Sequence, residues 1–139
     1  MKELVDVLHE GPHSLAVRDA CSGHVAVFDG RGVSDLFRLL NEAPGFLRGA
    51  DVADKVVGKG AAALMILAGI NTLHADVISS PALELFEGSL VKVSFGKEVP
   101  NIINRGGDGI CPVETLCLRC STAAECLPLI TKFMNSINN

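Results

Sequence analysis

The apolar positions near the amino end of the chain follow two different spacings. Leu4, Val5 and Leu8 recur at helical spacing and predict a short helix. Strand-like alternation follows in SLAVRD (14–19) and in HVAVFD (23–28), with the turn-rich segment ACSG between them. Two alternating runs around a short turn predict a β-hairpin.

The centre of the chain predicts two helices and a strand. Residues 33–43 place their apolar side chains on one face and predict a helix that Pro44 closes. Residues 49–70 predict one long helix, and its second half is apolar all round, as in a helix packed centrally against a sheet. TLHADVIS at 72–79 predicts a strand.

The remaining elements continue the alternation of strand and helix. SerSerPro at 79–81 indicates the cap and first turn of a short helix that ends at Gly88, and LVKVSF at 90–95 alternates as a strand. Pro128 predicts a kink or break in the last helix. The element order predicts one α/β domain over residues 1–139, with three layers and a mixed sheet that has helices on both faces.

Charge and composition narrow the classes of function. A net charge of -4 with scattered basic residues, no Trp and no Tyr argues against a nucleic-acid partner. The longest apolar run, 61–70, is much shorter than the roughly 20 residues of a membrane span, and the first residues lack the features of a signal peptide. We therefore expect a cytoplasmic protein without a membrane or nucleic-acid partner.

Four of the five cysteines lie close together in sequence, in the order Cys111, Cys117, Cys120 and Cys126. Structural zinc usually pairs two CxxC or HxxxH segments, and the second is absent here. A redox pair would place CxxC at the start of a helix, whereas this one would close the helix expected over 112–119. Buried packing thiols are the favoured interpretation, and no metal or cofactor is assigned.

Cys111 and Glu114 flank Pro112 at the expected start of that helix. Cys111 at the N-cap would have its thiolate stabilised by free backbone NH groups, which makes it a candidate nucleophile or a simple cap. Glu114 is placed to accept the Cys111 backbone NH in a capping box, with general acid/base chemistry as the alternative.

Charged residues and glycines lie near the start of the predicted long helix. Lys55 and Lys59, four residues apart, could contact one anionic group or lie on a solvated face. Asp54 beside them is a candidate proton-transfer residue. Gly58 and Gly60 would permit close packing or close approach of a ligand.

Two segments carry a family resemblance. VADKVVGKGAAAL (52–64) and IINRGGDGICPVE (102–114) resemble the signature segments of an uncharacterised bacterial family known only as a domain of unknown function. The resemblance extends over about residues 14–118 and implies a fold similar to that of cytidine deaminases. It also implies that the helix at 52–68 takes the place of the deaminase helix that bears a zinc ligand.

The deaminase zinc motifs are missing at the places that the resemblance indicates. Deaminase chemistry needs a His or Cys with a Glu at the start of one helix and PCxxC at the start of the next. Here those places hold Asp54, Lys55 and the segment 79–83, without a thiolate or an imidazole. The resemblance therefore implies a deaminase-like domain without zinc.

In deaminase-like folds the start of the long helix lines the pocket, so the candidate residues are expected to converge there. The candidate catalytic residues are Cys111, Glu114 and Asp54, and the candidate ligand-binding residues are Lys55, Lys59, Asn104, Arg105, Gly107 and Asp108. The favoured hypothesis is the binding of a small anionic or nucleotide-like ligand. The alternatives are a Cys-dependent enzyme, with Cys111 as nucleophile or sulfur carrier, and a non-catalytic interaction subunit that buries apolar helix surface in a homodimer.

Overall fold

The computed structural model describes residues 1–30, 33–103, 107 and 109–137. Within these residues, five strands form one open sheet in the order β2-β1-β3-β4-β5. β1 runs antiparallel to β2 and to β3, whereas β3, β4 and β5 are mutually parallel. The strands are β1 (Leu15–Arg18), β2 (Val25–Phe28), β3 (Asp51–Val57), β4 (Thr72–Ser79) and β5 (Lys92–Val99).

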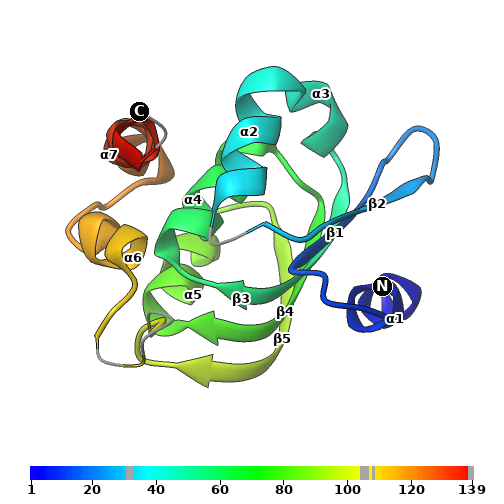
Figure 1. Ribbon diagram of the computed structural model, residues 1–139, viewed down its shortest axis with the longest axis horizontal. Helices are drawn as coiled ribbons and strands as arrows, with labels where there is room; N and C mark the ends of the chain where they lie inside the picture. The colour runs from blue at the N-terminus through cyan, green and yellow to red at the C-terminus, as the bar shows by residue number, and fades with distance from the viewer. Residues whose placement is uncertain (31–32, 104–106, 108, 138–139) are drawn as a thin grey trace.

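Helices flank this sheet, as the sequence predicts for a three-layer α/β fold. They are α1 (Lys2–His9), α2 (Ser34–Glu42), α3 (Pro44–Leu47), α4 (Lys59–Ala68), α5 (Ser80–Glu87), α6 (Pro112–Cys117) and α7 (Ala123–Ile137). Figure 1 shows α1 on one side of the sheet and the other helices on the opposite side. None of the helices in the described residues combines the length and apolar character that a membrane span needs.

The predicted hairpin is confirmed, and it supplies one end of the sheet. β1 and β2 pair from Leu15 opposite Phe28 to Arg18 opposite Val25. The inner strand β1 is buried, while Val25 and Val27 of the edge strand β2 are exposed. Burial of β1 follows from its position between β2 and β3 and from the packing of α1 on β1 and β3.

The predicted long helix over 49–70 is wrong in its first half. Asp51–Val57 form the central strand β3, and the helix begins only at Lys59. Gly58 separates the two elements with an extended backbone, φ -98° and ψ -178°. β3 buries the consecutive residues Val52, Ala53 and Asp54, so both faces are covered there and the sequence lacks the alternation that identifies a half-exposed strand.

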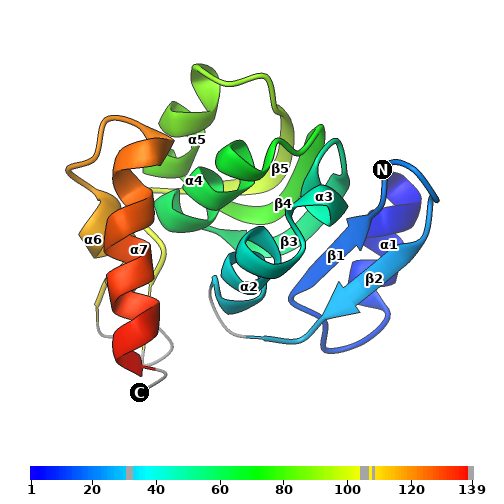
Figure 2. The same cartoon turned by 90° about the horizontal axis from the view of Figure 1, so that it is seen from above.

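The second half of that segment is the central helix, as predicted. Ala61, Ala62, Ala63, Leu64 and Met65 are all buried. α4 packs against α2, α5, α6 and α7 as well as β3, so side chains on every side of it contact other elements. Figure 2 shows α4 between α2, α5 and α7. The helix ends at Gly69, whose φ of 74° lies in the left-handed region that glycine favours.

Two elements near the carboxyl end differ from their predicted extent. β5 continues to Val99, past the alternating run that ends at Phe95, because its whole length pairs with β4. α7 is one helix from Ala123 to Ile137 with Pro128 inside it. Cys126, Ile130 and Met134 hold the helix against the core on both sides of the proline, so packing compensates the missing backbone donor.

Close packing explains the two glycines at the start of α4. A Cβ atom added to Gly60 would overlap Cγ1 of Val113 on α6. A Cβ at Gly58 would lie 3.1 Å from Cγ1 of Ile102 and 3.3 Å from Oε1 of Glu114. The absence of side chains at these positions allows α6 and the segment around Ile102 to approach the helix start.

Gly60→Ala is expected to destabilise the protein by about 1–3 kcal/mol, because Val113 must move to accept the new methyl group. Gly45→Ala is the matched control, since Gly45 also lies in a helix and its added Cβ meets nothing within 4 Å. Helix propensity alone would stabilise both variants by up to about 1 kcal/mol. Unfolding in urea measures which effect is larger, the displacement of Val113 or the gain in helix propensity. Stabilisation of both variants would contradict the packing argument.

Candidate functional site

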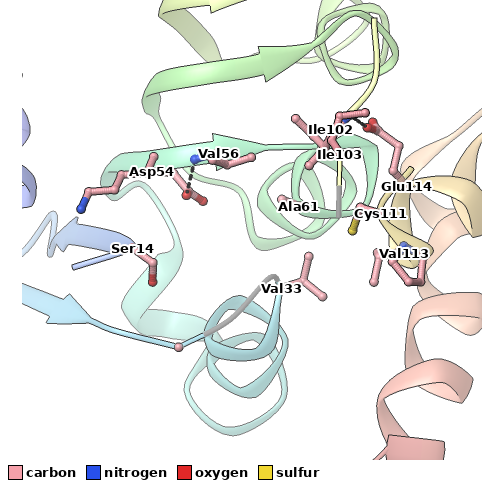
Figure 3. Close-up of a pocket in the computed structure, with 15 residues that line it drawn as sticks. Ser14, Val33, Asp54, Val56, Ala61, Ile102, Ile103, Cys111, Val113 and Glu114 are labelled. Atoms are coloured by element: carbon pink, nitrogen blue, oxygen red, sulfur yellow. Dashed lines mark hydrogen bonds between the residues drawn. The ribbon is translucent and has the colours of Figure 1, made fainter. Parts of the chain in front are cut away.

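A cavity of about 430 Å³ opens where β3 ends and α4 begins. Its walls come from the ends of several elements: the start of β1, the start of α2, β3, the start of α4, the segment 102–103 and the start of α6. Figure 3 shows Asp54 and Cys111 on opposite sides of this space. The lining residues are Ser14, Gly30, Val33, Asp54, Lys55, Val56, Gly58, Gly60, Ala61, Ile102, Ile103, Cys111, Pro112, Val113 and Glu114.

Glu114 joins three segments at the inner wall of the cavity. Its side chain is buried, with 1 % of its surface exposed. Oε1 accepts hydrogen bonds from the backbone NH of Lys59 at 3.0 Å and from Oγ of Ser79 at 2.5 Å, and Oε2 accepts one from the backbone NH of Ile102. The carboxylate therefore connects the first residue of α4, the N-cap of α5 and the chain that follows β5.

The predicted capping box of Glu114 is wrong. The backbone NH of Cys111 donates to the carbonyl of Ile102 at 2.8 Å, and the Glu114 carboxylate is occupied by partners 12 to 55 residues away in sequence. The local capping bond does not form because three donors from other segments bind the same carboxylate. Both carboxylate oxygens of Glu114 accept hydrogen bonds from groups of the fold itself. This arrangement therefore does not favour the alternative of general acid/base chemistry at Glu114.

Lys59 holds the other end of α6. Its side chain is buried, and Nζ donates to the carbonyl of Leu118 at 3.1 Å and to that of Cys120 at 2.5 Å. Carbonyl groups at the end of a helix lack intrahelical donors, and a cation satisfies them well. The residue does not line the cavity. Its ammonium is therefore committed to α6 rather than placed for a ligand.

Asp54 is a buried acid in the cavity wall whose pKa is raised. It lies in β3, and 7 % of its surface is exposed. Burial raises the pKa of its carboxyl to about 8, and the negative charges of Asp76 and Asp35 act in the same direction. The backbone NH of Val56 donates to Oδ1 at 3.2 Å, as Figure 3 shows. At neutral pH this group is mainly a neutral carboxylic acid.

The side chains of Lys55 and Lys59, for which contact with one anion or a solvated face are the predicted alternatives, bond to different parts of the chain. Lys55 lies in β3 rather than in a helix, so the four-residue helical spacing does not apply to it. Its Nζ donates to the carbonyl of Gly11 at 3.5 Å, while Lys59 bonds to carbonyls after α6. Lys55 does line the cavity and remains the cation nearest to Asp54 in sequence.

The cysteines separate into two groups. Cys111 is the N-cap of α6, as predicted, and its half-buried side chain lines the cavity. Cys117 and Cys126 are fully buried in the core, where a hydrogen bond between their thiols lowers the pKa of Cys117 and raises that of Cys126. Burial and Cys126 together raise the pKa of Cys120. Cys117 and Cys126 thus lie in the core and Cys120 packs against it, whereas Cys111 lines the cavity.

In the part of the chain that the structure describes, no group of three or more His, Cys, Asp or Glu side chains is arranged to hold a metal ion. Cys117 and Cys126 fill the core between α6 and α7, which agrees with the interpretation of buried packing thiols.

Four of the predicted site residues meet at the cavity: Asp54, Lys55, Cys111 and Glu114. Gly107 is exposed with a φ of 74° and does not line it. The predictions for Asn104, Arg105 and Asp108 lie outside the described residues. Sequence reasoning missed the apolar walls, because Val33, Val56, Ile102 and Val113 are ordinary core-type residues that only the fold brings together. The sequence predicts Ser79 only as a helix cap and does not show that its hydroxyl also donates to Glu114.

Comparison with known proteins gives the chain a family. Residues 3–134 match the family model described as TM1506, a domain of unknown function. The chain belongs to the DUF1893 family. A solved DUF1893 family protein from Thermotoga maritima, TM1506, is 26% identical, with a TM-score of 0.84 over 94% of this chain and 87% of the other. No curated protein matches this DUF1893 chain.

Glu114→Gln is expected to destabilise this DUF1893 domain by about 2–4 kcal/mol. The amide can accept through one oxygen only, and its NH₂ group would face a donor that the carboxylate now satisfies. Glu125→Gln is the control, because Glu125 is exposed and, within the described part of the chain, accepts one long bond, from the Ser121 backbone NH at 3.3 Å. Equal unfolding free energies for the two variants in urea would contradict the role assigned to Glu114.

Asp54→Asn is expected to change how stability depends on pH. The pKa of Asp54 is raised above its unfolded value, so the folded state holds a proton that the unfolded state has lost between about pH 4 and about pH 8. The stability that the folded state gains from holding this proton is fully present below about pH 4. It declines by up to about 1.4 kcal/mol per pH unit as pH rises, and it is lost above about pH 8. The variant has no such proton.

The measurement is the difference in unfolding free energy between Asp54→Asn and the unmodified protein across that range, because all other titrating groups cancel in the difference. The variant should gain in relative stability as pH rises to about 8 and then level off. A difference that does not vary with pH would show that Asp54 is ionised in the folded protein at neutral pH.

Proposed function

We propose that this chain is a zinc-independent, cytidine-deaminase-like domain that binds a small nucleotide-like ligand in the cavity between β3, α4 and α6. The observation that carries the proposal is the cavity itself. Its volume of about 430 Å³ lies in the usual range for small-molecule sites. Its walls are mostly apolar, with Asp54 and Lys55 among the polar groups, a combination typical of small-molecule sites.

The start of α4 supports an anionic group on the ligand. α4 has ten residues, and its N-cap Gly58 has no side chain to satisfy the first backbone NH groups. Glu114 takes the NH of Lys59, but Gly60 and Ala61 line the cavity and follow it in the first turn. Free NH groups and the helix dipole at such a start attract phosphate. A ligand with a phosphate beside an apolar ring would satisfy both features.

The deaminase-like part of the proposal rests on the arrangement of the sheet and the following helices. The hairpin β1-β2 opens the sheet, and α4 and α5 directly follow β3 and β4, as the resemblance implies. In deaminases the starts of two such helices hold zinc. Here the α4 start reads GlyLysGly (58–60) and the α5 start reads SerSerPro (79–81), without a metal ligand of the deaminase kind.

The Glu114 carboxylate supports a zinc-free version of this site. It bonds to the NH of Lys59 at the start of α4 and to the hydroxyl of Ser79 at the start of α5. A buried carboxylate with satisfied donors can hold two helix starts together without a metal. We infer that this part of the fold is maintained by Glu114, and that the cavity beside it remains free for a ligand.

Binding is favoured over catalysis by the surroundings of Cys111. An activated nucleophile needs a base within hydrogen-bond reach. Among the described residues, no imidazole or carboxylate hydrogen-bonds the Cys111 thiol, and the nearest acid along the helix, Glu114, is already bonded to three donors. The thiol lines the cavity and is half-buried. It therefore serves best as a reporter of occupancy.

The test is a binding panel of cytidine, uridine and adenosine, their 5′-monophosphates and inorganic phosphate. Binding is measured by the shift in melting temperature and by calorimetry. A ligand at about 100 times its Kd is expected to add about 2.7 kcal/mol to the free energy of unfolding. The bound ligand should also protect Cys111 from iodoacetamide and leave the exposed Cys21 unprotected. No shift with any nucleotide at millimolar concentration would overturn the proposal.

A matched pair of variants localises the ligand. Val56→Glu places a negative charge at the cavity, where Val56 is 49% exposed, and should weaken nucleotide binding at least tenfold. Val27→Glu changes a valine of similar exposure, 40%, on the edge strand β2, which does not line the cavity, and should leave binding unchanged. Equal affinities of the two variants would place the ligand elsewhere.

A further inference from the structure

We infer that Asp54 recognises the base of the ligand by donating a hydrogen bond to an unprotonated acceptor, a ring nitrogen or a carbonyl oxygen. The inference rests on the proposed function, because it concerns the same cavity. It goes further by naming the chemical class of group that the cavity selects, which is a neutral heterocyclic acceptor rather than an ammonium or amidinium cation.

Asp54 presents its carboxyl group to the cavity. Oδ1 accepts from the backbone NH of Val56 at 3.2 Å, and the backbone NH of Lys55 also bonds to the carboxyl, so the main chain of β3 holds the side chain in place. The residue is more than nine-tenths buried and lines the cavity, so its second oxygen has little contact with bulk water. A ligand in the cavity can therefore reach the carboxyl where water competes little for its hydrogen bond.

The surroundings decide which form of the carboxyl meets the ligand. Among the described residues, the charged groups around Asp54 are Lys55 beside it in β3, Asp76 of β4 and Asp35 of α2, while Glu114 of α6 lies across the cavity (Figure 3). Lys55 is bonded to the carbonyl of Gly11, and Lys59 of α4 to carbonyls after α6. Asp76 and Asp35 are both acids, so burial and charge both favour the protonated carboxyl.

A protonated carboxyl with Oδ1 engaged presents an O–H donor to the cavity. Val33, Val56 and Ala61 are among the apolar residues that line the same cavity. An O–H group in apolar surroundings discriminates strongly between a ligand that offers a lone pair and one that does not, because the unmatched donor would stay buried without a partner. Nucleobases offer such lone pairs on ring nitrogens and carbonyl oxygens, and apolar walls accept their rings.

The alternative ligand class gives the opposite response to pH. A cationic ligand would bind the ionised carboxylate, so its affinity would rise as Asp54 loses its proton. A neutral acceptor loses its donor over the same range. The sign of the pH dependence of binding therefore distinguishes the two ligand classes in the same cavity.

The experiment measures the affinity of cytidine 5′-monophosphate and of adenosine 5′-monophosphate by calorimetry between about pH 6.5 and about pH 9.5. The unmodified protein should lose up to tenfold in affinity per pH unit above about 8, where the carboxyl ionises. Asp54→Asn keeps a donor on its amide at every pH and should bind with an affinity that does not fall over this range. Asp54→Leu removes the donor and should bind at least tenfold more weakly at about pH 6.5.

The possible outcomes separate this inference from the proposed function. Affinity that does not depend on pH in the unmodified protein, affinity that rises with pH, or full affinity in Asp54→Leu would each overturn the role of Asp54 while the cavity remains a nucleotide site. Absence of binding by both nucleotides at about pH 6.5, in protein whose melting curve shows that it is folded, would overturn the proposed function and this inference with it.

Discussion

The structure depends on one buried carboxylate. Glu114 accepts hydrogen bonds from the start of α4, from the N-cap of α5 and from the chain that follows β5. A charge in a protein interior is tolerated only when donors surround it, and the same donors would be unsatisfied without it. The two helix starts and α6 are therefore fixed by a single group. Gly58 and Gly60 follow from this constraint, because side chains there would push Ile102 and Val113 away from α4.

The cavity is a consequence of the same arrangement. α6 is held at its start by Glu114 and after its end by Lys59, whose ammonium binds the carbonyls of Leu118 and Cys120. These attachments keep α6 beside α4 and leave a space in front of β3. Asp54 lies at the far wall of that space, as Figure 3 shows. A rigid frame with one perturbed acid in an apolar pocket is typical of sites that select small ligands.

The division of the cysteines agrees with this arrangement. Cys117 and Cys126 are part of the core that α6 and α7 share, and Cys111 faces the cavity instead. The segment GICPVETLCLRC therefore serves two purposes within twelve residues: its first half forms the wall of a cavity, and its second half fills the core. The DUF1893 family has no assigned function, so the cavity is the feature of this fold on which functional experiments should concentrate.

The sequence by itself determined the local elements whose signals are short-range: the hairpin, α2, α5 with its Ser79 cap, the apolar helix α4, and the helix start at Pro112. It also indicated Asp54, Lys55, Cys111 and Glu114 as residues of one site. Tertiary structure alone decided that 51–57 is a central strand, because burial on both faces removes the alternation that identifies strands. It also decided what Glu114, Lys59 and Asp54 do. Their partners lie far away in sequence, and a carboxylate bonds to whichever donors the fold brings within reach.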